Sequence, residues 1–279
     1  MANSSDDYPI PRGVIDSVRL NVGHLLWKKE FPWVVHPSVP LKDRENLRIA
    51  DVGCGTGLWV LEAYEEFPHA EAVEGLDVAL HQAPAKHLLP GNVKFSYFNA
   101  YEHVPEQFIG RYDLIHARFL LALVKNDDPI PLVQKLMKML KPDGYIQWNE
   151  TDWECDTYVG LEENGITKEE SGMHRMRSFG RQGSSLGTIT WPQKLATILQ
   201  EQGMKLIKED RTTLETFPRM YASYWTDTIV AAAIDAHSKM PAGELRSTYA
   251  RLIDGASEDA RKGIAWVADH IVVVAQKQG

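Results

Sequence analysis

A short stretch after an apolar run carries the residues best suited to chemistry. It reads DVGCGTG, from Asp51 to Gly57, and follows the apolar run LRIA at 47–50. Glycines at alternate positions allow left-handed backbone dihedrals and let a ligand touch the main chain. In an open parallel sheet, ligands bind beyond the carboxyl ends of the strands, where such a turn would lie. The stretch therefore predicts a small-molecule binding turn that opens with an acidic side chain.

The first alternative is a dinucleotide-binding turn, which also places glycines directly after a strand. Its fingerprint G-x-G-x-x-G requires a third glycine at position 58, and that position holds Leu58. The pattern present is D-x-G-x-G-x-G. Taken alone, it also fits a phosphate-binding turn or a tight turn without a ligand, so the surrounding elements must decide.

The elements that position this turn alternate between strands and helices from residue 47 onward. Strands are predicted for LRIADV, AEAVEGLDV, NVKFSYFNA, YDLIHARFL and GYIQWNE, and later for MKLIKEDRT and HIVVVAQK. Helices are predicted for LWVLEAYEEFP, for PIPLVQKLMKMLK up to the breaker at 142–144, and from Trp191 onward. The first of these helices is expected to carry Leu58, Leu61, Tyr64 and Phe67 on one face. Such alternation predicts βαβ units in a mainly parallel sheet.

Four segments are expected along the chain. Residues 1–40 form an N-terminal helical arm, with its helix over 14–30, and residues 41–150 form the ligand-binding core. Residues 151–190 are a lid insertion, with a helix over 168–179 and a loop at GRQGSSLG. Residues 191–279 return to the sheet and contain a helical insertion at 217–263.

Five ordered features resemble the class I methyltransferases that use S-adenosylmethionine. They are DVGCGTG, VEGLD ending at Asp77, Asn99-Ala100 after the third strand, YDLIHAR, and LKPDGYIQWNE. The resemblance covers residues 47–150 closely and the last two strands loosely. It implies a Rossmann-like, doubly wound, mainly parallel seven-stranded α/β sheet, with the helical arm and the lid insertions added to it.

The resemblance also implies how the cofactor would be held. In that family the glycine turn holds the methionine part, the acid at Asp77 binds the ribose hydroxyls, and the residues at Asn99-Ala100 meet the adenine. Asn99 replaces the more usual Asp, so its amide oxygen would contact the adenine amine. The cofactor-binding residues are expected to be Asp51, Gly53, Cys54, Gly55, Gly57, Asp77, Val78, Asn99, Ala100, His116 and Arg118. Cys54 is expected to be a small filler, since nothing nearby in sequence would lower its pKa.

A narrower resemblance concerns the arm and the turn. The segments GHLLWKKEFPWVVHPSV, GLWVLE and YDLIHARFL are similar to the fungal secondary-metabolism methyltransferases that include the regulator of the velvet complex. Members of that group mostly methylate small natural products. This resemblance implies a small-molecule acceptor, with oxygen first and nitrogen, sulfur and carbon left open.

Methyl transfer from a sulfonium is an in-line displacement, and a hydroxyl or amine acceptor must also lose a proton. Glu150 and His174 are the first candidate bases, followed by His24, while His116 is expected beside the cofactor. The plainer interpretations are that His24 packs the arm, His174 is a solvated helix residue and Glu150 pairs with Arg118. No metal is expected, because the fourth strand ends in His-Ala-Arg, which offers no hard oxygen ligands.

Aromatic residues crowd the segments expected to roof the pocket, which favours an apolar or aromatic acceptor, although ordinary core packing explains them equally well. They are Trp148, Trp153, Trp191, Tyr221, Tyr224 and Trp225. The turn after the fourth strand, IHARFL, lacks the motifs of adenine, glutamine and protein arginine methyltransferases. A small molecule is therefore the favoured acceptor.

Composition limits the partners. A net charge of −8 argues against a nucleic-acid partner, and no apolar stretch approaches the ~20 residues that span a bilayer. Two cysteines and a polar, acidic N-terminus favour a soluble cytoplasmic protein. A homodimer or a protein partner stays open. The rival functions are a regulatory or scaffold protein that keeps the fold, and a cofactor-bound cyclase that transfers no methyl group.

Overall fold

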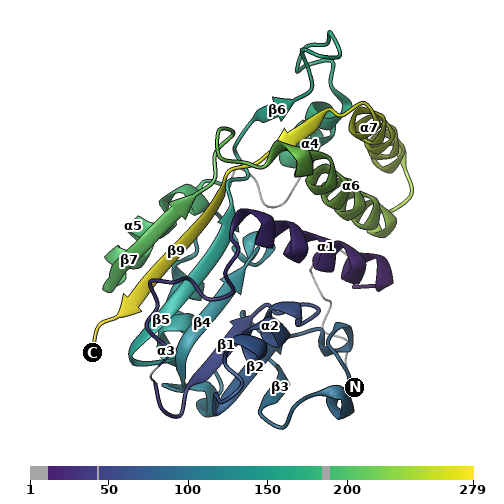
Figure 1. The fold of residues 1–279 in the computed structure, drawn as a ribbon. Coiled ribbons are helices and arrows are strands. Elements are labelled where there is room, and N and C mark those ends of the chain that lie inside the picture. Colours follow the sequence, from purple (N-terminus) through teal and green to yellow (C-terminus); the bar gives the residue numbers. More distant parts are fainter. Residues whose placement is uncertain (1–11, 43, 184–188) are drawn as a thin grey trace. The chain divides into compact units, whose positions relative to one another are not determined.

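The computed structural model describes residues 12–42, 44–183 and 189–279, and its chain divides into two compact units (Figure 1). The sheet unit comprises residues 27–154, 189–217 and 268–279. The helical unit comprises the described residues within 1–26, 155–188 and 218–267. Among the described residues, no helix combines the length and the apolar character needed to cross a membrane.

The sheet unit is built on seven strands in the order β3-β2-β1-β4-β5-β9-β7, which confirms the predicted seven-stranded sheet. Strands β1 to β5 pair in parallel, whereas β9 runs antiparallel to both β5 and β7. The order reverses between β1 and β4, and ligands of such sheets bind outside the carboxyl ends of the strands at that reversal. The strands are β1 Arg48–Val52, β2 Ala72–Asp77, β3 Val93–Tyr97, β4 Tyr112–Arg118, β5 Leu140–Thr151, β7 Met204–Arg211 and β9 His270–Lys277.

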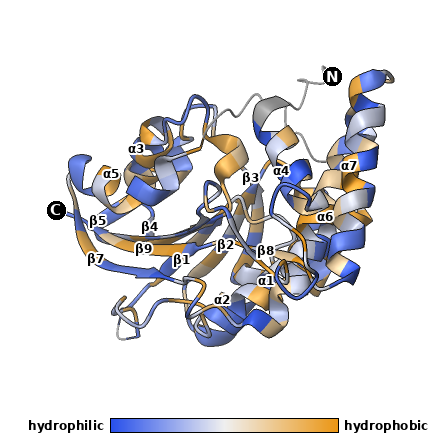
Figure 2. Ribbon diagram, turned by 90° about the horizontal axis from the view of Figure 1, so that it is seen from above, coloured by the Kyte–Doolittle hydropathy of each residue, from blue (hydrophilic) through white to orange (hydrophobic). Residues whose placement is uncertain are grey.

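Helices cover both faces of this sheet, so its central strands can be apolar along their whole length. Figure 2 shows α3 (Ile130–Met139) and α5 (Leu195–Glu201) on one face and α2 (Leu58–Glu66) on the other. Strands β4 and β9 are almost continuously buried, whereas the edge strand β7 is mostly hydrophilic. The short 3-10 turns are η1 Leu80–Gln82, η2 Lys86–Leu88, η3 Glu106–Phe108, η4 Leu121–Leu123, η5 Trp191–Lys194 and η6 Arg219–Tyr221.

The structure adds to one local prediction in the sheet unit and corrects another. Leu61, Tyr64 and Phe67 of α2 pack against the core and are partly buried, whereas the fully buried residues of α2 are Trp59, Val60 and Ala63. Helix α3 ends at Met139, before the expected breaker, and β5 begins at Leu140. Residues 142–144 fall in a register shift of the sheet, because Tyr112 pairs with Leu140 but Leu114 pairs with Tyr145. The residues predicted to end the helix therefore lie within β5, at the irregularity in its pairing with β4.

The helical unit contains most of α1 (Val14–Glu30), together with α4 (Gly172–Gly183), α6 (Ala222–Lys239) and α7 (Glu244–Arg261). The bounds predicted for α1 are confirmed, as are two helices within 217–263. Strands β6 (Thr157–Val159) and β8 (Ala265–Val267) form an antiparallel pair that the sequence did not predict.

Helix α4 begins four residues later than expected. The Ser171 hydroxyl accepts a hydrogen bond from the backbone N–H of His174 at 3.2 Å, which is the arrangement of an N-cap. Both Ser171 Oγ and the N–H of Met173 donate to Asp259 of α7, at 2.7 and 3.0 Å. The contact with α7 therefore decides where α4 starts. The helix also continues through 180–183, the first half of the expected loop, and 184–187 lie outside the described residues.

Candidate functional site

The glycine turn lies at the carboxyl end of β1, as the sequence predicted. Gly53, Gly55 and Gly57 have φ values of 72°, 52° and 76°, in the left-handed region that favours glycine. A Cβ on Gly57 would lie 2.4 Å from the ring of Phe95, and one on Gly53 would lie 2.6 Å from the Leu120 side chain. Backbone conformation favours all three glycines, and close neighbours also require those at 53 and 57, which leaves the main chain bare.

Asp77 lies beside this turn at the end of β2. Its Oδ2 accepts a hydrogen bond from the N–H of Gly55 at 2.9 Å, and its Oδ1 accepts one from the N–H of Ala79 at 2.8 Å. The side chain is only partly buried, and a carboxylate can accept about four hydrogen bonds. The structure thus brings the acid of VEGLD into contact with the glycine turn, with capacity left for further donors.

The glycine in VEGLD has a packing reason that sequence reasoning missed. Gly75 of β2 pairs in register with Phe95 of β3, and a Cβ on Gly75 would lie 2.3 Å from that ring. The same Cβ would lie 2.9 Å from Cys54 Sγ. Phe95 therefore supports the turn from below. The alternation of apolar residues in NVKFSYFNA was the available signal.

Asp51 sits in a buried polar row beneath the turn. Its Oδ1 lies 2.7 Å from His116 Nδ1, and His116 Nε2 lies 3.2 Å from Asn149 Nδ2. The imidazole stacks on Trp59 with ring centroids 4.0 Å apart and planes 4° from parallel. All three residues are 4% exposed or less. The sequence identified Asp51 and His116 as cofactor residues, whereas Asn149 was not among the expected site residues.

Asn99 and Ala100 follow β3, and neighbouring residues fix their orientation. Asn99 Oδ1 accepts from the N–H of Tyr101 at 3.0 Å, while its Nδ2 donates to Glu102 Oε1 at 3.0 Å. A backbone N–H can only donate, so the amide oxygen is identified without ambiguity, and it keeps a second lone pair. Lys135 Nζ donates to the carbonyl of Ala100. A surface pocket of about 420 Å³ adjoins them, lined by Tyr101, Glu102, His103 and Lys135.

Glu150 is fully buried and bonded to three donors rather than to Arg118. Its Oε2 accepts from the N–H of Leu120 at 2.9 Å and from Trp148 Nε1 at 3.3 Å, and its Oε1 accepts from the N–H of Thr151 at 3.3 Å. Burial raises the pKa of Glu150 to about 8. The ion pair with Arg118 considered from the sequence is not formed by these two described residues.

Arg118 instead interacts electrostatically with Asp51, the acid that opens the turn. Burial lowers the pKa of its guanidinium to about 10, and the charges of Asp51 and Glu62 oppose that shift. The pKa of Cys54 is raised well above its ordinary value, first by burial and then by the charges of Asp51 and Asp77. Cys54 is therefore a buried filler without thiolate character. Val78, beside Asp77, is 36% exposed.

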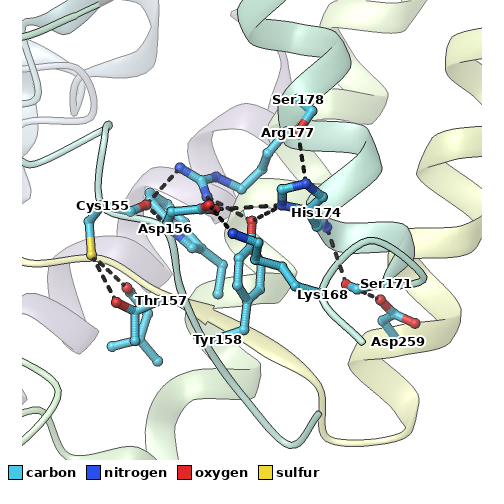
Figure 3. A network of polar contacts seen from close by, with 12 residues as sticks. Cys155, Asp156, Thr157, Tyr158, Lys168, Ser171, His174, Arg177, Ser178 and Asp259 are labelled. Carbon is cyan, nitrogen blue, oxygen red and sulfur yellow. Dashed lines mark hydrogen bonds and ion pairs between the residues drawn. The ribbon is translucent and has the colours of Figure 1, made fainter. Parts of the chain in front are cut away.

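The remaining predicted residues belong to the helical unit. His24 is buried in α1 at 2% exposure. His174 of α4 joins a network of polar side chains (Figure 3), in which its Nδ1 lies 3.3 Å from the Tyr158 hydroxyl and 3.5 Å from Asp156 Oδ1. Its Nε2 lies 3.3 Å from Ser178 Oγ. The structure thus gathers the predicted cofactor residues in one unit, and two of the three candidate bases belong to the other.

The aromatic residues expected above the pocket separate into two groups. Trp148 and Trp191 pack edge to face, with centroids 5.4 Å apart, and are at most 1% exposed. They are core residues of the sheet unit, which agrees with the core-packing interpretation, and Trp153 belongs to the same unit. Tyr221, Tyr224 and Trp225 lie in the helical unit, where Tyr224 is 55% exposed.

Comparison with known proteins identifies the family. Residues 35–209 match the model of the methyltransferase domain family. The chain is 30% identical over 250 residues to the methyltransferase grgD of a Penicillium species, covering 86% of each chain. It is 26% identical over 147 residues to the N-methyltransferase verN of Clonostachys rogersoniana, covering 53% of this chain and 51% of that one.

A similar share of the chain matches a regulator. The identity is 37% over 156 residues to the secondary metabolism regulator LAE1 of Cochliobolus heterostrophus, covering 54% of this chain and 49% of that one. The match thus spans about half the length of this regulator and of verN. These relatives confirm the narrower resemblance to fungal secondary-metabolism methyltransferases.

Solved structures agree on the fold. The 4+2 cyclase SpnF superposes with a TM-score of 0.54 at 17% identity, covering 94% of this chain and 81% of that one. Coclaurine N-methyltransferase, bound to N-methylheliamine and SAH, superposes with a TM-score of 0.52 at 13% identity, covering 93% and 72%. At these identities the likeness concerns the fold alone. The family model, the relative that aligns over most of both chains and the seven-stranded sheet together show that this chain belongs to the methyltransferase domain family, with the class I fold.

Proposed function

We propose that this protein transfers a methyl group from S-adenosylmethionine to a small natural product, with an oxygen atom as acceptor. The observation that carries the proposal is the hydrogen bond of 2.9 Å between Asp77 and the N–H of Gly55. This bond places a partly exposed carboxylate beside the bare main chain of the turn. A ligand that has both a ribose and an extended polar arm could contact the two together. Leu120 and Phe95 fill the space that a Cβ at Gly53 or Gly57 would need, so the turn must keep these glycines.

The residues of this surface fit the parts of the cofactor. Asp77 would accept the ribose hydroxyls with its remaining lone pairs, and Asn99 Oδ1 would accept from the adenine amine. The turn and the buried acid Asp51 would hold the methionyl end. The cofactor supplies a methyl group activated by the sulfonium charge, and S-adenosylhomocysteine is the product. The chain itself contributes position, charge and a route for the acceptor's proton.

The relatives support a small-molecule acceptor and bear on its reacting atom. The match to grgD extends over most of both chains, and that protein carries the name methyltransferase. The relative verN is named an N-methyltransferase, so nitrogen is the first alternative to oxygen. We propose an apolar or aromatic acceptor and a cytoplasmic protein. Trp148 and Trp191 no longer support the apolar acceptor, because both are buried in the core.

Exposure separates the three candidate bases. A general base must come within hydrogen-bond reach of the proton it removes, directly or through one water. Glu150 is 0% exposed and His24 is 2% exposed, whereas the side chain of His174 is 20% exposed. We therefore propose His174 as the base. Glu150 instead holds the N–H of Leu120, whose side chain packs against Gly53 of the turn.

A regulatory role is the second candidate function. It is favoured by the match to the regulator LAE1, which is 37% identical over 156 residues. A non-methylating cyclase is supported by fold alone, since SpnF is only 17% identical. Both alternatives would leave the cofactor surface intact, so turnover must be measured as well as binding.

Calorimetric titration with S-adenosylhomocysteine tests the proposed function. We expect wild-type protein to bind it, and Asp77→Ala to bind it about a hundredfold more weakly, because charge-assisted hydrogen bonds are lost. Glu65→Ala, at an exposed position of α2, is the matched control and should bind like wild type. Folded wild-type protein that binds no S-adenosylhomocysteine would overturn the proposal, and binding of NAD instead would favour a dinucleotide enzyme.

A further inference from the structure

Three strands contribute one side chain each to the polar row beneath the turn. Asp51 comes from β1, His116 from β4 and Asn149 from β5, and the register places Asp51 opposite His116. The row is continuous, with 2.7 Å between Asp51 and His116 and 3.2 Å between His116 and Asn149. None of these residues belongs to the surface of the molecule, since each is at most 4% exposed.

The chemistry of the row determines where the imidazole carries its proton. Asn149 Nδ2 is a donor, so His116 Nε2 must accept, and the ring proton must then lie on Nδ1. If the amide were turned so that Oδ1 faced the ring, His116 would carry protons on both nitrogens. In either orientation Nδ1–H donates to the carboxylate of Asp51.

Packing holds the imidazole flat against a neighbouring ring. Trp59 covers one face of the ring, in parallel stacking at 4.0 Å. The backbone carbonyl of Asn149 also accepts from the N–H of Phe119, at 3.1 Å, so the end of β5 is tied to the chain that leaves β4. A buried carboxylate is costly to keep ionised without a donor, and this row supplies one in a single geometry.

The charge of Asp51 acts on the turn itself. It opposes the lowering of the pKa of Arg118 and adds to the raising of the pKa of Cys54, which lies inside the turn. A negative potential there favours a ligand that presents a cation. The methionyl end of S-adenosylmethionine carries an ammonium group.

We propose that His116 is a positioning residue that orients Asp51 toward the ammonium group of the cofactor, and that Asn149 sets the tautomer of His116. The inference rests on the proposed function and deepens it. His116 does not touch the reacting atoms, so its effect appears in the binding of one part of the cofactor.

Two ligands separate this role from a general effect on the fold. S-adenosylhomocysteine carries the amino-acid arm, whereas 5′-methylthioadenosine retains the adenosine and lacks the ammonium. We expect His116→Phe, which keeps a flat ring against Trp59 but removes the donor, to weaken S-adenosylhomocysteine about tenfold to a hundredfold. Binding of 5′-methylthioadenosine should change by less than about threefold. Asn149→Leu should show the same selectivity with a smaller loss.

Nuclear magnetic resonance gives a second readout that does not depend on ligand. Long-range ¹⁵N–¹H spectra of wild-type protein should show His116 protonated on Nδ1, and Asn149→Leu should broaden or shift that signal. Asn149→Leu also carries the binding test if His116→Phe does not fold. His116→Gln, which retains an N–H donor, should recover part of the lost affinity.

The outcomes distinguish the inference from the proposed function. Wild-type protein that binds neither ligand would overturn both. Wild-type protein that binds both ligands, with variants that weaken the two equally or not at all, would overturn the positioning role alone. A ring protonated only on Nε2 in wild-type protein would overturn it as well.

Discussion

Each unit contains a contact between a histidine and an aspartate, and the two contacts differ in almost every physical respect. In the sheet unit, His116 Nδ1 lies 2.7 Å from Asp51 Oδ1, and the two side chains are 1% and 5% exposed. In the helical unit, His174 Nδ1 lies 3.5 Å from Asp156 Oδ1, and the side chains are 20% and 33% exposed. The first is a short bond without competing solvent. The second is a longer contact that water can replace.

The partners around each contact differ as well. Asp156 also pairs with Lys168 at 2.8 Å and with Arg177 at 3.6 Å (Figure 3). Arg177 itself donates to the Tyr158 hydroxyl at 2.9 Å and lies 3.7 Å from the ring centroid of Trp266. Burial raises the pKa of Asp156, but Lys168, Tyr158 and His174 outweigh it, so the pKa is lowered overall.

This difference teaches how the two kinds of polar cluster are specified. Paired strands fix the positions of Asp51 and His116 to one geometry, so neutral and charged groups can be buried there beside specific partners. The cluster around Asp156 relies on several charges that share one carboxylate at the surface, where each pair contributes little. The buried pair of Asp51 and His116 is suited to orienting a ligand. The cluster around Asp156 is suited to holding α4 by contacts that can rearrange, or to exchanging protons with solvent.

The largest expected effect is that of substituting His174, and it tests whether the helical unit takes part in catalysis. Because glutamine cannot take up a proton, His174→Gln should lower kcat by about a hundredfold, while the affinity for S-adenosylhomocysteine is unchanged. Ser178→Ala, which removes the partner of His174 Nε2, is the matched control and should keep most of the turnover. A His174→Gln enzyme with wild-type kcat would show that this cluster only attaches α4 and takes no part in proton transfer.

The next effect is the pH dependence of stability that Glu150 of the sheet unit should cause. The folded pKa of Glu150 is about 8 against an ordinary value of 4.5, so the folded state binds the extra proton between these values. Stability should therefore fall as pH rises from about 4.5 to about 8, by on the order of 4 kcal/mol from this group. Glu150→Gln should remove that contribution, as urea unfolding at pH 5, 6.5 and 8 would reveal. Equal pH slopes for the two proteins would contradict it.

The smallest effect concerns the exposed carboxylate. Asp156→Asn should cost about 1 kcal/mol or less near neutral pH, because half-exposed ion pairs are screened by solvent. The folded pKa of Asp156 is lowered, so this contribution exists above the ordinary carboxyl range and is lost as pH falls through the folded value. Thermal unfolding of the variant and of Glu163→Gln, an exposed control, should show it. A loss of several kcal/mol would mean that this cluster behaves like the buried one.

Local signals made much of the fold predictable. Glycine spacing located the turn, and helical periodicity ended by prolines gave the bounds of α1 correctly. Where packing between distant segments decides, prediction was less accurate. Helix α4 begins at Gly172 because Ser171 bonds Asp259, 88 residues away along the chain. The buried face of α2 is centred on Trp59 because His116 of another element stacks there.

The amino-acid sequence by itself determined the family, the position of the cofactor turn and the acid Asp77, because each depends on residues close together in the chain. Only the tertiary structure decided that Phe95 supports the turn through Gly75, that Glu150 is buried on backbone donors, and that Asn149 completes a row through His116 to Asp51. Most of those contacts join different strands, and that of Glu150 with Leu120 joins β5 to the chain that follows β4. Strand register and burial create them, and neither can be read from the spacing of residues along one segment.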